Sequence, residues 1–219
     1  MVHKQNEGRN YSGLGPDERA KRRRTAVLAA ALDLFGTQGY APTSVKQICQ
    51  AAGLTERYFY AVFRDRHACL IGLYGELTRD LRNATTAAID QSSTDGELDA
   101  IITSGLTAFV DFLTADPRRA RVVLIEVVGV SPELEVRRHG VLREFAELIT
   151  AVWSTNAGTV KTARGTGNDT NAQRLTAVGL VGAVNHLLVD WLLSGREDEP
   201  AALVQVSTAL FSAAHARVT

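Results

Sequence analysis

The fold can be predicted mainly from one stretch of the sequence, Thr43–Arg66, TSVKQICQAAGLTERYFYAVFRDR. Ser44 and Gln47 have the spacing of a capping box, which predicts that a helix begins there. Gly53 ends that helix, because glycine readily adopts the positive φ that helix termini often require. Thr55 then caps a second, shorter helix. The sequence therefore predicts two helices joined by a tight turn.

Apolar side chains in both helices recur at steps of three and four residues, which places them on one face. The inward-facing residues are Val45, Ile48 and Ala52 in the first helix and Phe59, Val62 and Phe63 in the second. The second helix is left with four residues facing outward, namely Glu56, Arg57, Tyr58 and Tyr60. A short helix with such an outer face suits the major groove of DNA. We therefore interpret the stretch, over about residues 44–63, as a helix-turn-helix.

The remainder of the chain also predicts helices, and it contains no strand-like alternation. Pro16 suits the first turn of an opening helix, Gly39 ends that helix, and Asp65 is placed to cap a fourth one. The later helices are expected at about 66–83, 97–114, 118–128, 132–153, 172–194 and 201–217. A segment at 155–171, rich in Gly, Thr and Asn, is the one long loop. The predicted fold class is all-α, with about nine helices.

This arrangement resembles the DNA-binding domain of TetR-type transcriptional regulators. The matching residues are Leu34-Phe35, Gly39-Tyr40, Thr43-Ser44-Val45, Ile48, Ala51-Ala52-Gly53-Leu54-Thr55, Phe59-Tyr60, Phe63 and Arg66, about a fifth to a quarter of the chain. The resemblance implies three parts. Residues 1–17 form a flexible arm, 18–66 a three-helix DNA-binding domain, and 67–219 a helical domain for ligand binding and dimerisation.

The resemblance also implies which side chains meet DNA. Glu56, Arg57 and Tyr58 sit where base edges are contacted, and arginine suits guanine while glutamate accepts from cytosine N4. The residues expected to contact phosphate are Thr43, Ser44, Lys46, Tyr60 and Arg66. Such contacts fix the register of the protein on DNA but do not read the base sequence. Thr55, at the start of the second helix, completes this surface. The alternative is that these residues simply cover a solvated helix.

The distribution of charge agrees with a DNA-binding N-terminal third. Residues 1–68 hold eleven Lys and Arg against six Asp and Glu, whereas residues 69–219 hold thirteen against eighteen. A basic domain on an acidic body is expected where only that domain meets phosphate. Chance clustering on a solvated surface is the alternative. Lys4, Arg9 and the run Lys21–Arg24 could add phosphate or minor-groove contacts from the arm, unless residues 1–15 are a plain disordered tail.

Cysteine use and hydropathy favour a cytoplasmic protein. Cys49 and Cys69 are flanked by apolar residues, so buried thiols in a reducing compartment are the simple interpretation, with a redox or metal site as the alternative. The first twenty residues lack the apolar run of a signal peptide. The apolar segment Leu175–Leu193 is interrupted by Asn185, His186 and Asp190, which predicts a buried helix and not a membrane span.

A single helix-turn-helix contacts little DNA, so a homodimer on a palindromic operator is expected. Two copies on a two-fold axis would occupy successive major grooves about 34 Å apart. By resemblance, the dimer interface lies on the last two helices. Gly179, Gly182 and Ala183 lie close together there, and glycine inside a helix suggests close backbone approach. Tight packing within one subunit is the alternative.

The resemblance further implies a pocket among the fourth to eighth helices, where a ligand shifts the fourth helix and respaces the two DNA-binding domains. The candidate lining residues are Phe109, Phe112, Leu142, Phe145, Ile149 and Trp153, with Glu126, Asn185 and His186 as polar members. Each could equally be ordinary core, and Glu126 could pair with Arg121 or Arg143. The expected ligand is a small apolar or amphipathic molecule.

These observations predict a DNA-binding transcriptional regulator, a homodimeric repressor that a small molecule releases from its operator. Two alternatives remain open: a DNA-binding regulator without ligand control, and a helical interaction protein that has lost DNA binding. The sequence contains no P-loop, dinucleotide-binding or zinc-protease motif, so we expect no enzyme activity, no cofactor and no metal.

Overall fold

The computed structural model describes residues 15–92, 97–156 and 167–218, and within these ranges every regular element is a helix. The elements are α1 (Pro16–Thr37), α2 (Val45–Ala51), α3 (Glu56–Tyr60), α4 (Arg66–Ser92), α5 (Leu98–Thr114), α6 (Pro117–Arg121), the π-helical turn η1 (Val122–Glu126), α7 (Pro132–Asn156), α8 (Gly167–Leu193) and α9 (Pro200–Val218). The all-α prediction is confirmed. Most of the predicted arm (1–14) and of the predicted loop (157–166) lies outside the described residues.

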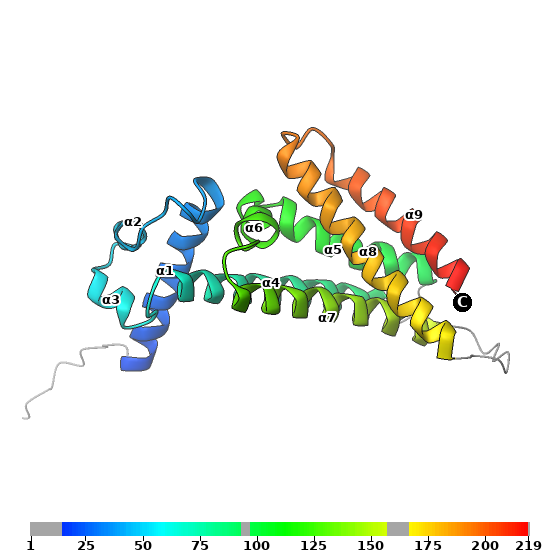
Figure 1. Cartoon of the computed structure of the whole chain (residues 1–219), viewed down its shortest axis with the longest axis horizontal. Helices are drawn as coiled ribbons and strands as arrows, with labels where there is room; N and C mark the ends of the chain where they lie inside the picture. Colours follow the sequence, from blue (N-terminus) through cyan, green and yellow to red (C-terminus); the bar gives the residue numbers. More distant parts are fainter. Residues whose placement is uncertain (1–14, 93–96, 157–166, 219) are drawn as a thin grey trace, which may run out of the picture.

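Helices α1 to α3 lie together at one end of the molecule, and the other helices form a longer body beside them (Figure 1). The turn forms as the sequence predicts. Ser44 and Gln47 make the capping box, and Gly53 ends α2 with φ +64°. Phe35, Ile48 and Phe59, one from each helix, are fully buried and form the centre of this end. Asp65 Oδ1 accepts the Ala68 amide at 2.7 Å and so caps α4.

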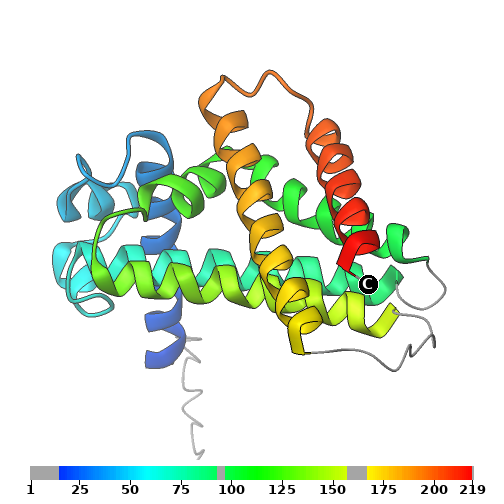
Figure 2. The same cartoon turned by 45° about the vertical axis from the view of Figure 1, so that its right-hand side comes forward.

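Helices α4 and α7 run side by side in the same direction along the body (Figures 1 and 2). Side-chain bonds join them at both early and later turns, from His67 to Ser131 at 2.8 Å and from Arg82 to Glu144 at 3.2 Å. Equivalent turns of the two helices therefore face each other. Helices α8 and α9 lie across this pair on the opposite side from the DNA-facing end.

Two predicted helix boundaries were wrong. Helix α4 continues to Ser92 instead of ending near Asn83, because its last turns pack on α5. Gly105 of α5 leaves room for Ile89 to lie close against it, since an added Cβ would stand 2.9 Å from the Ile89 side chain. Packing of this kind overrides the weak helix propensity of the β-branched residues there.

The second difference lies at the predicted helix 118–128. Asp116 caps a short α6, and the chain then widens into the π-helical turn η1 before Gly129 ends it with φ +71°. A π turn holds an extra residue, so the residues after it point in other directions than an α-helix would give them. Turns of this kind often mark functional positions.

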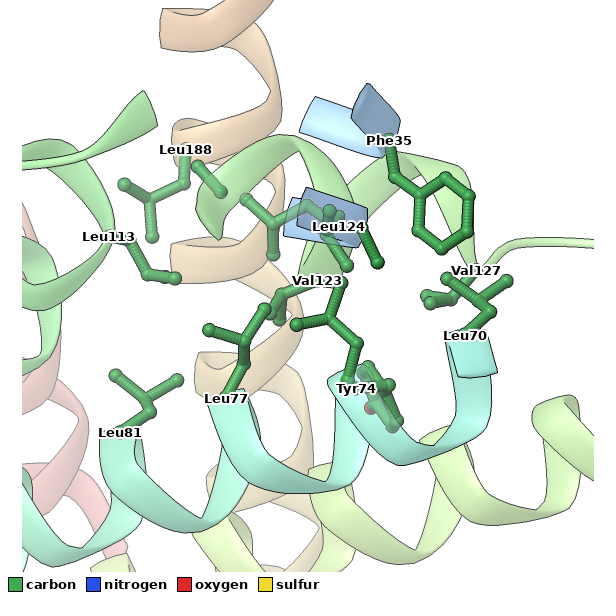
Figure 3. Packing of buried hydrophobic residues seen from close by; sticks show 14 of the residues in the cluster. Phe35, Leu70, Tyr74, Leu77, Leu81, Leu113, Val123, Leu124, Val127 and Leu188 are labelled. Atoms are coloured by element: carbon green, nitrogen blue, oxygen red, sulfur yellow. The ribbon is translucent and has the colours of Figure 1, made fainter. Parts of the chain in front are cut away.

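One continuous hydrophobic core joins the DNA-facing end to the body. Figure 3 shows Phe35 of α1 near Leu70 of α4 and Val127, while Leu113 lies beside Leu188 further along, with Leu77 of α4 below them. All six of these side chains are buried. The two ends of the molecule are therefore packed against each other through α4 and the α6–η1 segment.

Helix α8 is buried on one side only, so the prediction of a buried helix was wrong for its outer face. Over Thr170–Leu193 it is long and apolar enough to cross a membrane by length and composition, but the core helix of a soluble protein passes the same test. Only 28% of its most apolar window is buried inside the protomer. The apolar outer face is thus open to a partner.

Candidate DNA-binding surface and ligand cavity

The outer face of α3 is exposed as the sequence predicts. Glu56, Arg57, Tyr58 and Tyr60 are all exposed, with Tyr58 at 45% and Tyr60 at 53% of their surface. Phe59, between them, is fully buried and fixes the helix on the core. Thr55 takes the N-cap position but makes no side-chain cap bond, so its hydroxyl is available to a ligand. These side chains form one surface that a DNA groove can reach.

On α2, Ser44 and Lys46 are exposed beside this surface. The Ser44 amide donates to Gln47 Oε1 at 2.8 Å, and the Gln47 amide donates to Ser44 Oγ at 3.2 Å. This capping box fixes the first turn of α2. Lys46 makes no ion pair within the described ranges, so its ammonium group is free to meet phosphate.

Two predicted phosphate contacts have structural roles instead. Thr43 is fully buried, and its hydroxyl donates to the Gly39 carbonyl at 2.7 Å. Arg66 donates to the carbonyls of Ala41, at 3.0 Å, and Thr43, and its guanidinium lies 4.3 Å from the centre of the Tyr40 ring. Both side chains hold the α1–α2 turn, and the buried Thr43 hydroxyl is closed off from DNA. The sequence did not reveal this, because their partners are backbone carbonyls brought close only by the fold.

Arg23 is a neighbour of the recognition surface that the sequence analysis assigned to the arm. It lies on α1, and its guanidinium carbon stands 5.2 Å from the centre of the Tyr58 ring. A cation over an aromatic face at this distance is attracted to the ring. Arg23 therefore supports Tyr58 and adds positive charge beside α3. The basic run Lys21–Arg24 was the available signal.

Glu126, at the end of η1, holds the body to the DNA-facing end. Its Oε2 accepts the Tyr40 amide at 2.7 Å, and its Oε1 accepts Arg121 Nε at 2.9 Å. Arg121 also donates to the Thr37 carbonyl at the end of α1, at 3.1 Å. The Glu126 side chain is only 13% exposed. We call these three hydrogen bonds the Glu126 junction. Arg121 is one of the partners that the sequence analysis considered.

An apolar cavity of about 100 Å³ lies in the body between α4, α5, η1, α7, α8 and α9. Six of the predicted pocket residues line it: Phe109, Leu142, Phe145, Ile149, Trp153 and Asn185. Phe109 and Phe145 meet edge to face with ring centres 5.2 Å apart. Val123 and Leu124 of η1 also line it, so the turn that carries Glu126 faces the cavity as well.

Three other predicted pocket residues lie outside this cavity. Phe112 lies under Arg119, whose guanidinium carbon is 4.7 Å from the ring centre. Glu126 points to α1, because the π turn rotates it away from the body's interior. His186 is exposed on the outer face of α8. The helical periodicity of the sequence could not distinguish these faces.

Arg138 and Tyr74 are cavity residues that sequence analysis missed. Arg138 is the only charged residue among those that line the cavity, and its side chain is 30% exposed, so it reaches solvent as well. Its Nε donates to Glu135 Oε2 at 3.0 Å, and Glu135 Oε1 accepts the Gly129 amide at 2.7 Å. Burial raises the pKa of Tyr74 to about 12, while the nearby charge of Arg138 opposes this rise.

The N-terminal part of the chain matches a known family. Residues 27–73 match the family model described as bacterial regulatory proteins, tetR family. This part of the chain therefore carries the DNA-binding region of the TetR family. Its helix-turn-helix is the DNA-binding element of that family, which agrees with the resemblance seen in the sequence.

Solved structures of bacterial regulators share the fold over most of the chain. The fatty acid degradation regulator FadR from Bacillus halodurans matches with a TM-score of 0.72 at 18% identity, over 91% of this chain and 96% of that one. FadR from Bacillus subtilis, solved with stearoyl-CoA, matches with 0.68 at 15%, over 85% and 96%. A TetR-family regulatory protein from Rhodococcus RHA1 matches with 0.66 at 19%, over 86% and 96%. At these identities the likeness shows the fold.

In the body of this chain the outer face of α8 and α9 is apolar and exposed. Leu175 and Val178 of α8 and Val206 and Leu210 of α9 are all more than 40% exposed. Gly179 and Gly182 lie on this face, and a Cβ added to either would meet nothing within 4 Å. The two glycines are therefore not needed for packing inside the protomer. The alternative that explained them by such packing was wrong.

The two thiols of this chain, Cys49 and Cys69, are buried and form no disulfide. Burial raises the pKa of Cys49, and it raises the pKa of Cys69 to about 12. The thiolate is the reactive form of cysteine, so neither group is activated at neutral pH. The thiols behave as small apolar side chains of the DNA-facing core.

Proposed function

We propose that this protein is a homodimeric, cytoplasmic transcriptional repressor that leaves a palindromic operator when a small molecule occupies the body cavity. The main support for the proposal is the position of η1, between the cavity and the DNA-facing end. Val123 and Leu124 of this turn line the cavity, while Glu126 bonds the Tyr40 amide of the DNA-facing end. One short element thus touches both the candidate ligand and the DNA-binding domain.

The DNA side of the proposal rests on the exposed surface of α2 and α3. Arg57 is proposed to read guanine and Glu56 cytosine, with Tyr58 held against Arg23 at the groove edge. The proposed phosphate contacts are Ser44, Lys46, Thr55 and Tyr60, all of them exposed. Thr43 and Arg66 are not included, because the α1–α2 turn uses them.

The dimer side rests on the apolar outer face of α8 and α9. Large exposed apolar patches on a soluble protein commonly mark an interface. Gly179, Gly182 and Ala183 would allow the α8 helices of two protomers to approach closely, since the glycines meet nothing in their own protomer. The neighbouring Leu175, Val178 and Leu210 would then be covered.

The ligand side rests on the cavity and on its position. A small molecule changes DNA affinity only if it binds one arrangement better than the other. Filling the cavity would press on Val123 and Leu124, and moving η1 would strain or break the Glu126 junction. The fatty acid degradation regulator FadR from Bacillus halodurans, and FadR from Bacillus subtilis solved with stearoyl-CoA, support an apolar or amphipathic ligand.

The proposal is tested by three measurements on the purified protein. Selection from a randomised duplex library should enrich a two-fold-symmetric site, and light scattering should give a dimer. A compound that quenches Trp153 fluorescence should then lower affinity for that site. Operator binding that no cavity ligand changes would favour the regulator without ligand control. The absence of any enriched site, together with a weak salt dependence of binding, would favour an interaction protein.

A further inference from the structure

The protein buries two tryptophans, and they differ in whether the indole N–H makes a hydrogen bond. Trp191 is 4% exposed, and its Nε1 donates to the Asp198 carbonyl at 2.9 Å. Trp153 is 1% exposed, and its buried Nε1 makes no hydrogen bond within the ranges that the structure describes. A buried indole N–H usually has an acceptor, because an unpaired polar group costs free energy. The Trp153 N–H can therefore still take an acceptor from a ligand.

Trp153 lines the cavity, so a molecule held there can supply that acceptor. The two threonines of the cavity wall already use their hydroxyl protons within α4, since Thr78 donates to the Tyr74 carbonyl at 2.8 Å and Thr85 to the Leu81 carbonyl at 2.9 Å. Among the described residues of the wall, Trp153 alone has a buried side-chain polar atom that makes no hydrogen bond. Water is a poor substitute in an apolar cavity, because a buried water needs about two to four polar partners.

The volume of the cavity limits its ligand to a small molecule. That volume is about 100 Å³. An apolar cavity of about 150 Å³ holds one benzene molecule. Because the present cavity is smaller, it fits a compact molecule of about six non-hydrogen atoms or fewer. Long chains and fused rings exceed this volume.

The surroundings of Trp153 favour a neutral ligand. Arg138, the charged residue of the cavity wall, lies on the same helix about four turns away, roughly 22 Å at 1.5 Å per residue, and pairs with Glu135 at 3.0 Å. The His215 ring lies 5.5 Å from the Trp153 ring, centre to centre. Burial lowers the pKa of His215, so its imidazole is neutral at pH 7. A charged ligand beside Trp153 would lose its hydration without gaining a partner of opposite charge.

From this geometry we propose that the cavity binds a compact neutral molecule whose single hydrogen-bond acceptor, such as a ketone or ether oxygen, accepts from the Trp153 indole N–H. The remainder of the molecule is apolar and packs against the apolar wall. This inference rests on the proposed function, and it names the ligand class and the specificity-determining residue of the same cavity. A hydrocarbon of the same shape leaves the N–H unpaired, so the indole selects for the acceptor.

Nuclear magnetic resonance of the nitrogen-15-labelled, full-length protein tests this bond directly. The chain contains two tryptophans, so Trp191, whose N–H is already bonded, is an internal control for Trp153. Cyclopentanone should shift the Trp153 indole proton downfield in a saturable manner and leave that of Trp191 in place. Methylenecyclopentane has the same shape without the acceptor, and it should bind without that downfield shift. Equal shifts with both probes, or no saturable shift with cyclopentanone, would overturn the inference.

A larger ketone tests the size limit. Cyclooctanone has the same acceptor on a ring that exceeds the volume of the cavity, so it should bind about tenfold more weakly than cyclopentanone although it has more apolar surface to bury. Tighter binding of cyclooctanone would overturn the size limit.

A pair of variants assigns the donor. Trp153→Phe removes the N–H and keeps an aromatic ring, so the preference for cyclopentanone over methylenecyclopentane, taken as the ratio of their dissociation constants, should fall about fivefold. Trp191→Phe is the matched control, because Trp191 is also buried but does not line the cavity, and it should leave this ratio unchanged. Equal weakening of both probes by Trp153→Phe would overturn the assignment. Circular dichroism checks that each variant folds, and the spectra of the wild type test the bond independently of the variants.

Operator binding separates this inference from the proposed function. If cyclopentanone bonds the Trp153 N–H but leaves operator affinity unchanged, the ligand class stands and release by ligand fails. If a charged compound, or one without an acceptor, releases the operator without the downfield shift of Trp153, the proposed function stands and the ligand class fails.

Discussion

Two arginine–glutamate pairs flank the turn between η1 and α7, and they differ in what surrounds them. Arg121 and Glu126 face the DNA-binding domain, and Glu126 is 13% exposed and also accepts the Tyr40 amide. Arg138 lines the cavity, and its partner Glu135 is 36% exposed and also accepts the Gly129 amide. The bond lengths are nearly equal, at 2.9 and 3.0 Å.

The two pairs differ in how far water reaches their glutamates. Water competes little for Glu126, so its bonds fix the position of the DNA-binding domain. Water competes more for Glu135, so its bond to Arg138 contributes less to stability. The less exposed glutamate, Glu126, therefore suits a structural connection.

Removal of the buried glutamate should have the largest effect. Glu126→Ala leaves the Tyr40 amide and Arg121 without their acceptor, and we expect a loss of about 3 kcal/mol in the free energy of unfolding, together with weaker operator binding on every sequence. Urea unfolding measures the loss. Glu147→Ala is the control, because its exposed pair with Arg143 should contribute less than about 1 kcal/mol. Equal losses would mean that the two environments do not differ.

Arg57→Ala should separate base reading from the position of the domain. We expect a loss of about 2 kcal/mol on the preferred operator and relaxed preference at one base pair, because arginine pairs bidentately with guanine. Binding to a panel of operators with single changes measures both effects. A loss that is the same on every operator would make Arg57 a phosphate contact instead.

Arg66→Ala should act through stability and not through phosphate. The variant loses two hydrogen bonds and the contact with Tyr40, so we expect about 1 kcal/mol less stability and an unchanged salt dependence of DNA binding. Lys46→Ala should instead leave stability unchanged and reduce the salt dependence of DNA binding. Loss of one phosphate contact reduces the slope of log K against log salt by about 0.9. A smaller slope for Arg66→Ala than for the wild type would mean that Arg66 contacts phosphate.

Glu135→Gln should have the smallest effect, and that effect should depend on pH. The Gly129 amide and Arg138 lower the pKa of Glu135 below its ordinary value. A lowered folded-state pKa means that the carboxylate contributes stability above its unfolded pKa and loses it as pH falls through the folded value. The wild type should therefore be slightly more stable than the variant at neutral pH, and the difference should shrink as pH falls below about 4 and vanish only below the lowered folded-state pKa. Urea unfolding across this range measures it, and a constant difference would exclude the ionic contribution.

Local signals in the sequence predicted the DNA-facing end well. The capping box of Ser44 and Gln47, the positive φ of Gly53 and the cap at Asp65 each depend on a few neighbouring residues, and all three are present. Thr43 was misassigned, because the partner of its hydroxyl, the Gly39 carbonyl, comes near only when the turn closes.

The body was harder to predict, because its site is assembled from distant segments. Apolar periodicity found Phe145 and Trp153, but it could not show that Arg138 reaches the same cavity. The π turn at Val122–Glu126 has no signal in the hydrophobic pattern, and it redirects Glu126 towards α1. The junction and the cavity thus depend on a local distortion that helical periodicity does not encode.

The most direct test of this account is the operator affinity of wild type and Glu126→Ala with and without a compound that quenches Trp153 fluorescence, with the quenching confirming that the compound is bound in both proteins. The account predicts that the ligand lowers wild-type affinity about tenfold or more, whereas the variant binds weakly from the start and changes little. An equal loss in both proteins would contradict it, because the ligand would then act without the Glu126 junction.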